Sequence, residues 1–310
     1  MARLHKLTVM LGRTHGVPAL PTTAGKEMIN FAVDLKNQLI ILRETEITAK
    51  ISGAVGNRNE LNIAFPKKDW KNITETFIKR LNLAPQTHTT QIESHSNKIL
   101  IFNLLSQIAR IGAKLAQDLW IYNSLGYLSW KDNAGHVGSS VMPHKINPIG
   151  AELAQTYFVT GSETLHVIAN IIMENRMQRD LRDKYALRKT GEALAELLLA
   201  IEGITGSLRQ IGFNEKKLAD ELNNHWEVLS ASIQTILRIE NVENPYDLLK
   251  KLSRGNTWTQ EKFRNIIFQL PIEKSVKEKL QSLSPLTSTG EAVALVEDGI
   301  AQVNSFLKQS

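Results

Sequence analysis

A chain of 310 residues with 42% hydrophobic residues is long enough to bury a sizeable core, which argues against a disordered protein. Only 6% of the residues are aromatic, so Leu, Ile, Ala and Val must fill most of that core, as they do between packed helices. The net charge of +6 is compatible with nucleic acid, with an anionic membrane surface or with an anionic small substrate. The lack of cysteine excludes disulfides, thiolate nucleophiles and cysteine-based metal sites.

The basic residues do not form a nucleic-acid-binding stripe. Lysine pairs are scattered along the chain, at Lys67–Lys68, Lys216–Lys217 and Lys250–Lys251, without a dense cluster or interleaved aromatic residues, so we expect no nucleic-acid partner. The longest apolar run is far shorter than a membrane span, and the first residues lack the pattern of a signal peptide. The sequence therefore predicts a soluble cytoplasmic protein that has no membrane partner.

Apolar residues recur at spacings of three and four in three long stretches, which is typical of amphipathic helices. The stretches begin near Lys26, Ile101 and Leu194 and end near Ile51, Tyr122 and Ile211. No convincing run alternates apolar and polar residues. The predicted fold class is therefore all-α, a bundle of long helices packed side by side.

Polar breaks that are rich in Gly, Pro and Thr interrupt the helical pattern, at residues 12–26, 52–70, 84–96 and 135–148. After about residue 212 the predicted helices become shorter, with breaks at Pro245, Gly255, Pro271 and Pro285. We therefore predict two domains. Residues 1–210 form a central helical bundle that carries the loop 132–148, and residues 211–310 form a smaller C-terminal helical domain.

The polar breaks are candidate sites because helix ends expose backbone N–H groups that favour anions. Each residue in them also has an ordinary interpretation. His15 fits a surface histidine that caps a turn, and Ser139 and Ser140 fit helix caps. Gln91 and Lys145 fit solvated side chains. No histidine pair has metal-ligand spacing with a third ligand nearby, so we expect no metal.

Four segments together resemble one enzyme family. The segment "SSVMPHKINPIGAE" (139–152) resembles the signature of the fumarase/aspartase superfamily of lyases, and its "MPHK" resembles the adenylosuccinate lyase version. The segment 12–28 resembles the histidine segment of that family, "TTQIE" (89–93) its glutamine segment and "MQRDLRDKYALR" (177–188) its arginine segment. Residues 224–255 are similar to the C-terminal domain of a bacterial type of adenylosuccinate lyase.

The resemblance implies a β-elimination that cleaves the C–N bond of a succinyl-amino group. Adenylosuccinate would give fumarate and AMP, and the imidazole carboxamide precursor SAICAR would give fumarate and AICAR, in purine biosynthesis. Such a reaction needs a base that removes a proton from the carbon next to a carboxylate and a group that stabilises the dianion formed in this way. It also needs an acid that protonates the departing nitrogen. By family position, His15 would be the acid and Ser139 the base, ionised by Lys145 and by the N–H groups after Pro148.

The resemblance also implies the residues that bind substrate and the state of assembly. Thr14 and Gln91 would contact the substrate, Ser140 would bind it beside the base, Lys145 and Asn147 would hold the succinyl carboxylate, and Arg179 and Arg188 would hold phosphate and ribose. The family works as a homotetramer whose sites draw on several subunits. No cofactor is implied.

Two features differ from the family pattern. The family carries a further domain of roughly a hundred or more residues before the histidine segment, and this sequence begins almost at that segment. Val17 replaces a glutamine, and Lys184 and Tyr185 replace small hydroxyl residues. Two alternatives therefore stay open: a catalytically inactive truncated homologue that acts as an oligomeric helical scaffold, and another branch such as argininosuccinate lyase, which His144 disfavours.

Overall fold

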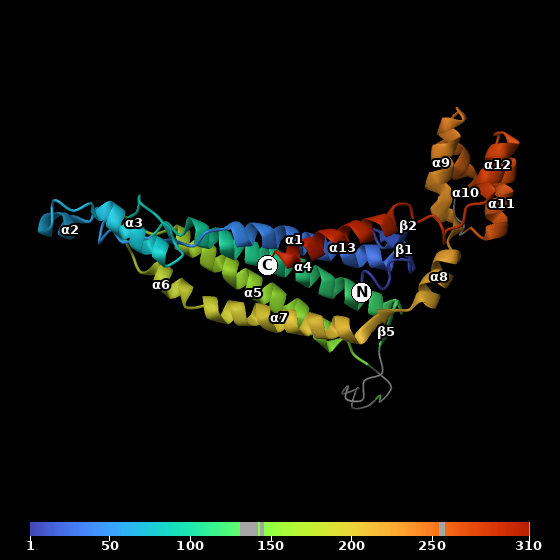
Figure 1. The fold of residues 1–310 in the computed structure, drawn as a ribbon. Helices are drawn as coiled ribbons and strands as arrows, with labels where there is room; N and C mark the ends of the chain where they lie inside the picture. Colours follow the sequence, from blue (N-terminus) through green and yellow to red (C-terminus); the bar gives the residue numbers. More distant parts are fainter. Residues whose placement is uncertain (131–141, 143–145, 254–257, 310) are drawn as a thin grey trace. The chain divides into compact units, whose positions relative to one another are not determined.

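The computed structural model describes residues 1–130, 142, 146–253 and 258–309. Most of the described residues are helical, which confirms the predicted all-α class (Figure 1). They form two compact units that do not follow a single cut of the chain. The first contains the described residues of 1–33, 121–130 and 210–309, and the second those of 34–120 and 142–209. The predicted division at residue 210 stays a prediction.

Long helices build the second unit. They are α1 (Ala24–Glu44, which starts in the first unit), α4 (Ser96–Ser124), α5 (Ile149–Met173) and α7 (Thr190–Gln210), and three of them match the predicted stretches. Helices α4, α5 and α7 run side by side (Figure 1) and approach closely at glycines. A Cβ atom on Gly112 of α4 would lie 2.5 Å from the ring of Phe158 on α5. Gly161 of α5 faces Leu197 of α7 in the same way.

Helix α4 is long and apolar enough to cross a membrane, judged by length and composition alone. One such helix is weak evidence, because a core helix of a soluble protein passes the same test. Nine residues of α4 are buried by the protein, among them Leu104, Leu115 and Leu119. Part of this apolar face packs against α5 at Gly112, within the second unit.

Short elements fill the breaks of the second unit. They are β3 (Thr48–Ala49), α2 (Asn59–Ala64), α3 (Trp70–Arg80), β4 (Ala84–Pro85) and α6 (Arg182–Leu187). Strand β3 pairs with β4 in parallel, and the N–H of Gln86 donates to the carbonyl of Ala49 at 2.8 Å. This pairing fixes the start of the polar segment that carries Gln91.

The first unit contains a β-hairpin that the sequence analysis missed. Strands β1 (Val9–Thr14) and β2 (Val17–Thr23) are antiparallel where we predicted only a polar break, so the expectation of no strand was wrong here. The register shifts between Leu11 and Arg13, and this bulge breaks the alternation of buried and exposed side chains by which a strand is recognised. A second pair joins β5 (Leu128–Trp130) to β6 (Ile211–Phe213).

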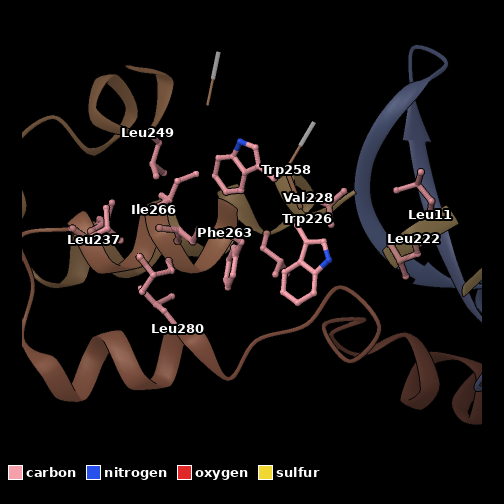
Figure 2. Packing of buried hydrophobic residues seen from close by; sticks show 14 residues of the cluster. Leu11, Leu222, Trp226, Val228, Leu237, Leu249, Trp258, Phe263, Ile266 and Leu280 are labelled. Atoms are coloured by element: carbon pink, nitrogen blue, oxygen red, sulfur yellow. The ribbon is translucent and has the colours of Figure 1, made fainter. Parts of the chain in front are cut away.

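The remaining helices of the first unit are short, as predicted. They are α8 (Glu215–Asn223), η1 (Trp226–Leu229), α9 (Ser230–Ile239), α10 (Pro245–Ser253), α11 (Gln260–Gln269), α12 (Lys274–Gln281) and the longer α13 (Ala292–Lys308). Pro245 begins α10 instead of interrupting a helix, because the first helical position needs no N–H donor. Trp226, Trp258 and Phe263 centre a buried apolar cluster, which Leu11 of β1 joins (Figure 2). The hairpin is therefore anchored in the same core as the C-terminal helices.

Candidate active site

The predicted acid, His15, lies in the turn of the β1–β2 hairpin. Thr14 pairs with Val17, so His15 and Gly16 form a two-residue turn, with φ angles of 55° and 77°. Two consecutive positive φ angles suit a hairpin whose strands twist to the right, and histidine tolerates this region better than most residues. The side chains of Thr14 and His15 are exposed. The backbone thus presents the imidazole to solvent at the tip of a short turn.

Arg13 connects this turn to other residues of the first unit. Its guanidinium donates to the carbonyl of Gly16 at 3.3 Å, to the Tyr127 hydroxyl at 3.3 Å and to Oε1 of Glu221 at 2.5 Å. The hydrogen bond with Tyr127 raises the pKa of Arg13, and burial raises the pKa of Tyr127. These three residues were not recognisable in the sequence, because Tyr127 and Glu221 lie 114 and 208 positions after Arg13. They tether the His15 turn to the body of the first unit.

The second unit brings the predicted glutamine and arginine segments together. The backbone N–H of Gln91 donates to the carbonyl of Gln178 at 3.1 Å, so Gln91 lies beside the residue that precedes Arg179. Gln91 is exposed, whereas the side chain of Arg179 is 27% exposed. Nε of Arg179 donates to the carbonyl of Asp180 at 2.7 Å. Two segments about 90 positions apart in sequence therefore meet at one place.

The other predicted binding residues have simpler surroundings. Arg188 directly follows α6 and is exposed, with its guanidinium 5.2 Å from the ring centroid of Tyr185. Asn147 is half-buried immediately before α5, which begins after Pro148 as expected. Lys184 is exposed, beside the buried Asp183. Ser139, Ser140 and Lys145 lie outside the described residues, and so do His136 and His144.

Glu152, the last residue of the signature segment 139–152, accepts a hydrogen bond from the indole N–H of Trp120 at 3.1 Å. Among the residues that the structure describes, no three histidine or acidic side chains are placed to hold a metal ion.

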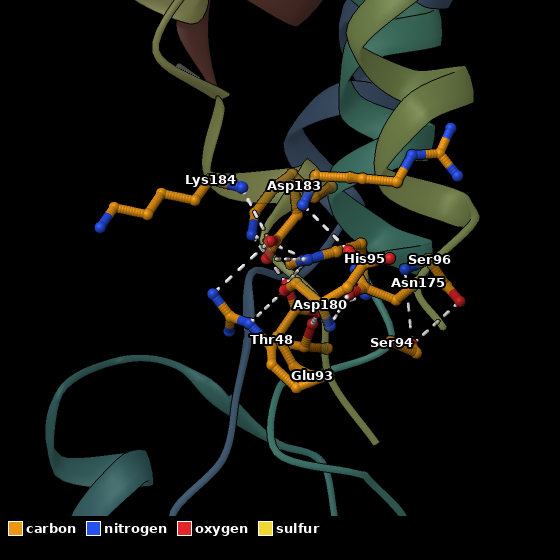
Figure 3. Close-up of polar contacts among 12 residues, drawn as sticks. Thr48, Glu93, Ser94, His95, Ser96, Asn175, Asp180, Asp183 and Lys184 are labelled. Atoms are coloured by element: carbon orange, nitrogen blue, oxygen red, sulfur yellow. Dashed lines mark hydrogen bonds and ion pairs between the residues drawn. The ribbon is translucent and has the colours of Figure 1, made fainter. Parts of the chain in front are cut away.

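A buried polar cluster lies next to Gln91 and Arg179, and we define it by Glu93, His95, Lys98, Arg179 and Asp183 (Figure 3). Nδ1 of His95 contacts Oε1 of Glu93, and Nε2 lies 3.4 Å from Oδ2 of Asp183. Nζ of Lys98 donates to Glu93 at 2.7 Å, and Nη2 of Arg179 lies 3.5 Å from Oδ1 of Asp183. Two carboxylates, two cations and one imidazole thus alternate in a continuous chain of contacts.

Burial alone would raise the pKa of Glu93. Hydrogen bonds from His95 and Lys98, together with the positive charge of Lys98, outweigh it and lower the pKa to about 2. The carboxylate is therefore ionised throughout the neutral range. This cluster was not recognisable in the sequence, because "IESHSNK" (92–98) has the composition of an exposed loop and nothing local shows that Asp183 will cover it.

Comparison with known proteins is consistent with this arrangement. Residues 1–160 match the family model described as Lyase, which is more than half of the chain, and residues 175–289 match the model described as Adenylosuccinate lyase C-terminal. The chain belongs to the lyase family that the first of these models describes. The resemblance of the four segments is thereby confirmed at the level of the family.

Curated relatives support the same membership. The adenylosuccinate lyase of Legionella pneumophila (strain Corby) is 39% identical over 297 residues, which are 96% of this chain and 65% of the relative. The adenylosuccinate lyase of Escherichia coli (strain K12) is 36% identical over 289 residues, which are 93% of this chain and 63% of the relative. The chain therefore spans just under two thirds of the length of the curated relatives that it matches.

Solved structures show the same fold at low sequence identity. The 3-carboxy-cis,cis-muconate lactonizing enzyme from Pseudomonas putida aligns with a TM-score of 0.73 and 19% identity, over 99% of this chain and 69% of its own. A fumarate lyase from Mesorhizobium sp. BNC1 aligns with a TM-score of 0.73 and 18% identity, over 97% of this chain and 68% of its own. At this identity the likeness concerns the fold alone.

Proposed function

We propose that the protein is a carbon–nitrogen lyase that releases fumarate from adenylosuccinate, with SAICAR as a second substrate, in purine biosynthesis. One observation carries the proposal: Gln91 and Arg179, from two family segments, meet through the hydrogen bond from Gln91 to Gln178. Curated relatives named adenylosuccinate lyase at 34% to 39% identity support the choice of substrate. No step of this reaction needs a cofactor.

The proposed chemistry is a β-elimination. A base removes a proton from the succinyl carbon next to a carboxylate, the C–H electron pair forms the new double bond, and the C–N pair leaves with nitrogen. His15 protonates that nitrogen, and Ser139 is the base. An exposed imidazole on a turn fixed by Arg13 suits an acid that must reach a bound substrate. Lys145, with the amide groups that open α5 after Pro148, would stabilise the serine anion.

The anionic ends of the substrate determine the remaining roles. Arg179 and Arg188 would bind phosphate and ribose. Asn147, Lys145 and Ser140 would hold the succinyl group. Thr14 and Gln91 would make further contacts with the substrate. The carbonyl of Asp180 and the carboxylate of Asp183 already hold the guanidinium of Arg179 in place. The Arg179 side chain is therefore already partly ordered, so it loses less conformational entropy when the substrate binds.

We also propose assembly as a homotetramer in the cytoplasm. On α7 of the second unit, Leu198, Leu199 and Ile201 are 63%, 46% and 47% exposed. On α5 of the same unit, Val167 is 54% exposed. Large apolar side chains gathered on bundle helices favour burial between copies of the chain.

A spectrophotometric assay of fumarate release tests the proposal, with adenylosuccinate, SAICAR and argininosuccinate supplied side by side to the purified protein. We expect turnover of the first two substrates and none of the third. Turnover of argininosuccinate alone would place the protein in another branch. An assembled, folded protein that binds AMP and releases no fumarate from any of the three would overturn the proposal and favour the scaffold.

A further inference from the structure

We infer that His95 is a positioning residue, which couples the Gln91 segment to Arg179 through Asp183. The inference rests on the proposed function for its kinetic consequence, although the coupling itself is a property of the second unit alone. His95 is not itself one of the predicted reacting groups, which are His15 and Ser139. It acts on two residues that are predicted to contact substrate.

The geometry of the imidazole supports this role. Its two ring nitrogens face carboxylates from two segments: Nδ1 contacts Glu93, two residues away, and Nε2 lies 3.4 Å from Asp183, 88 residues away. Asp183 in turn faces Arg179, with 3.5 Å between its Oδ1 and Nη2. The same Oδ1 accepts the backbone N–H of Lys184 at 2.7 Å, which fixes the carboxylate at the start of α6. One ring therefore joins both segments (Figure 3).

Burial makes these contacts strong. The side chains of His95 and Asp183 are each 5% exposed, and that of Glu93 is 11% exposed. Polar groups this deeply buried are costly when they lose a partner, so each member holds the next in one arrangement. Nζ of Lys98, 3.1 Å from Nδ1 of His95, supplies the positive charge that Glu93 requires at that end.

The backbone at His95 supplies a second, independent observation. His95 has a φ of 59°, in the left-handed region that costs energy for a residue with a side chain. Its N–H donates to Oε2 of Glu93 at 2.8 Å, and the next residue begins α4. The strained residue thus connects the Gln91 segment directly to a long helix of the bundle. Such strain persists when surrounding contacts fix the conformation, and here those contacts are Glu93 and Asp183.

The coupling predicts which kinetic constant changes. Neither Gln91 nor Arg179 is a proposed proton-transfer group, so loosening both should weaken substrate binding more than the chemical step. Asparagine at position 95 places an amide near the position of Nδ1 and reaches only Glu93. Glutamine places its amide near the position of Nε2 and reaches Asp183. The two variants therefore separate the local contact from the contact between segments.

The experiment compares His95→Asn, His95→Gln and Asp183→Asn with His88→Gln, which removes an exposed histidine from the same segment. We expect His95→Asn and Asp183→Asn to raise KM for adenylosuccinate about tenfold, equivalent to ~1.4 kcal/mol, with kcat nearly unchanged. His95→Gln should recover most of the binding, and His88→Gln should behave as the unsubstituted protein. Equal effects of His95→Asn and His95→Gln, or a loss in kcat alone, would overturn the inference.

Hydrogen exchange separates this inference from the proposed function, because it needs no turnover. The amide of Gln91, which donates to Gln178, should exchange faster in His95→Asn and in Asp183→Asn than in His88→Gln. If the unsubstituted protein releases no fumarate, the proposed function fails and this exchange measurement alone decides the coupling. Unchanged exchange of Gln91 in both variants refutes the coupling. If His95→Asn does not fold, Asp183→Asn tests the same contact from the other side.

Discussion

Replacement of Glu93 by glutamine tests the energetics of the buried polar cluster. Oε1 of Glu93 accepts from Nζ of Lys98 at 2.7 Å, and Oε2 accepts from the hydroxyl of Thr48 at 3.1 Å and from the backbone of His95 at 2.8 Å. Glutamine keeps the size of the side chain and removes its charge. The Lys98 and His95 contacts then lose the charge that strengthens them.

The magnitude follows from the pKa of Glu93. A fall from 4.5 to about 2 on folding corresponds to about 3 kcal/mol of stabilisation by the ionised carboxylate. Because the pKa is lower in the folded protein, this contribution is complete above pH 4.5 and is lost as the pH falls towards 2. Glu93→Gln should therefore be less stable by up to about 3 kcal/mol at neutral pH, with a smaller difference in acid.

The assay is urea unfolding followed by circular dichroism, at neutral pH and at several values below 4.5. Glu163→Gln is the control, because its ion pair with Arg110 joins side chains that are 55% and 52% exposed. That variant should lose less than about 1 kcal/mol. A difference between Glu93→Gln and the unsubstituted protein that stays constant from neutral pH into acid would refute the reasoning.

Two further predictions concern the cores of the units. Burial lowers the pKa of His5 below 6.5, against the opposing charge of Glu215, so the neutral form is favoured and its stabilisation is lost as the pH falls below 6.5. His5→Gln should flatten the pH dependence of urea unfolding in that range, and an unchanged profile would contradict this. Gly112→Ala should cost ~1–3 kcal/mol, because its Cβ would lie 2.5 Å from Phe158. Its control, Gly191→Ala, meets open space on α7 and should be neutral or stabilising by up to ~1 kcal/mol in thermal unfolding, and equal effects of the two would contradict the packing argument.

Periodicity was sufficient to predict the long helices and was insufficient for the hairpin. In α1, α4 and α7 the apolar spacing spans several turns, so the pattern survives local exceptions. In β1 a bulge after Leu11 interrupts the alternation within six residues, and β2 contains two prolines. A short strand leaves too few positions for a pattern to recover from one irregularity.

In the candidate site, too, short contiguous motifs could be predicted from the sequence, whereas contacts between residues far apart in the sequence could not. The segments that carry His15, Gln91 and Arg179 were recognisable because each is a contiguous motif. Their supporting residues were not recognisable, because Arg13 reaches Glu221 across 208 positions and His95 reaches Asp183 across 88. Such contacts depend on tertiary packing, which no local pattern of polar residues contains.

The most direct measurement is the rate of fumarate release by His15→Ala and by Ser139→Ala, with the mass of each assembly determined by light scattering. The account predicts that each variant keeps the assembly of the unsubstituted protein and loses roughly 10²- to 10⁴-fold in kcat, the usual contribution of a general acid or base. A variant that assembles normally and retains nearly the full rate would contradict the role assigned to that residue.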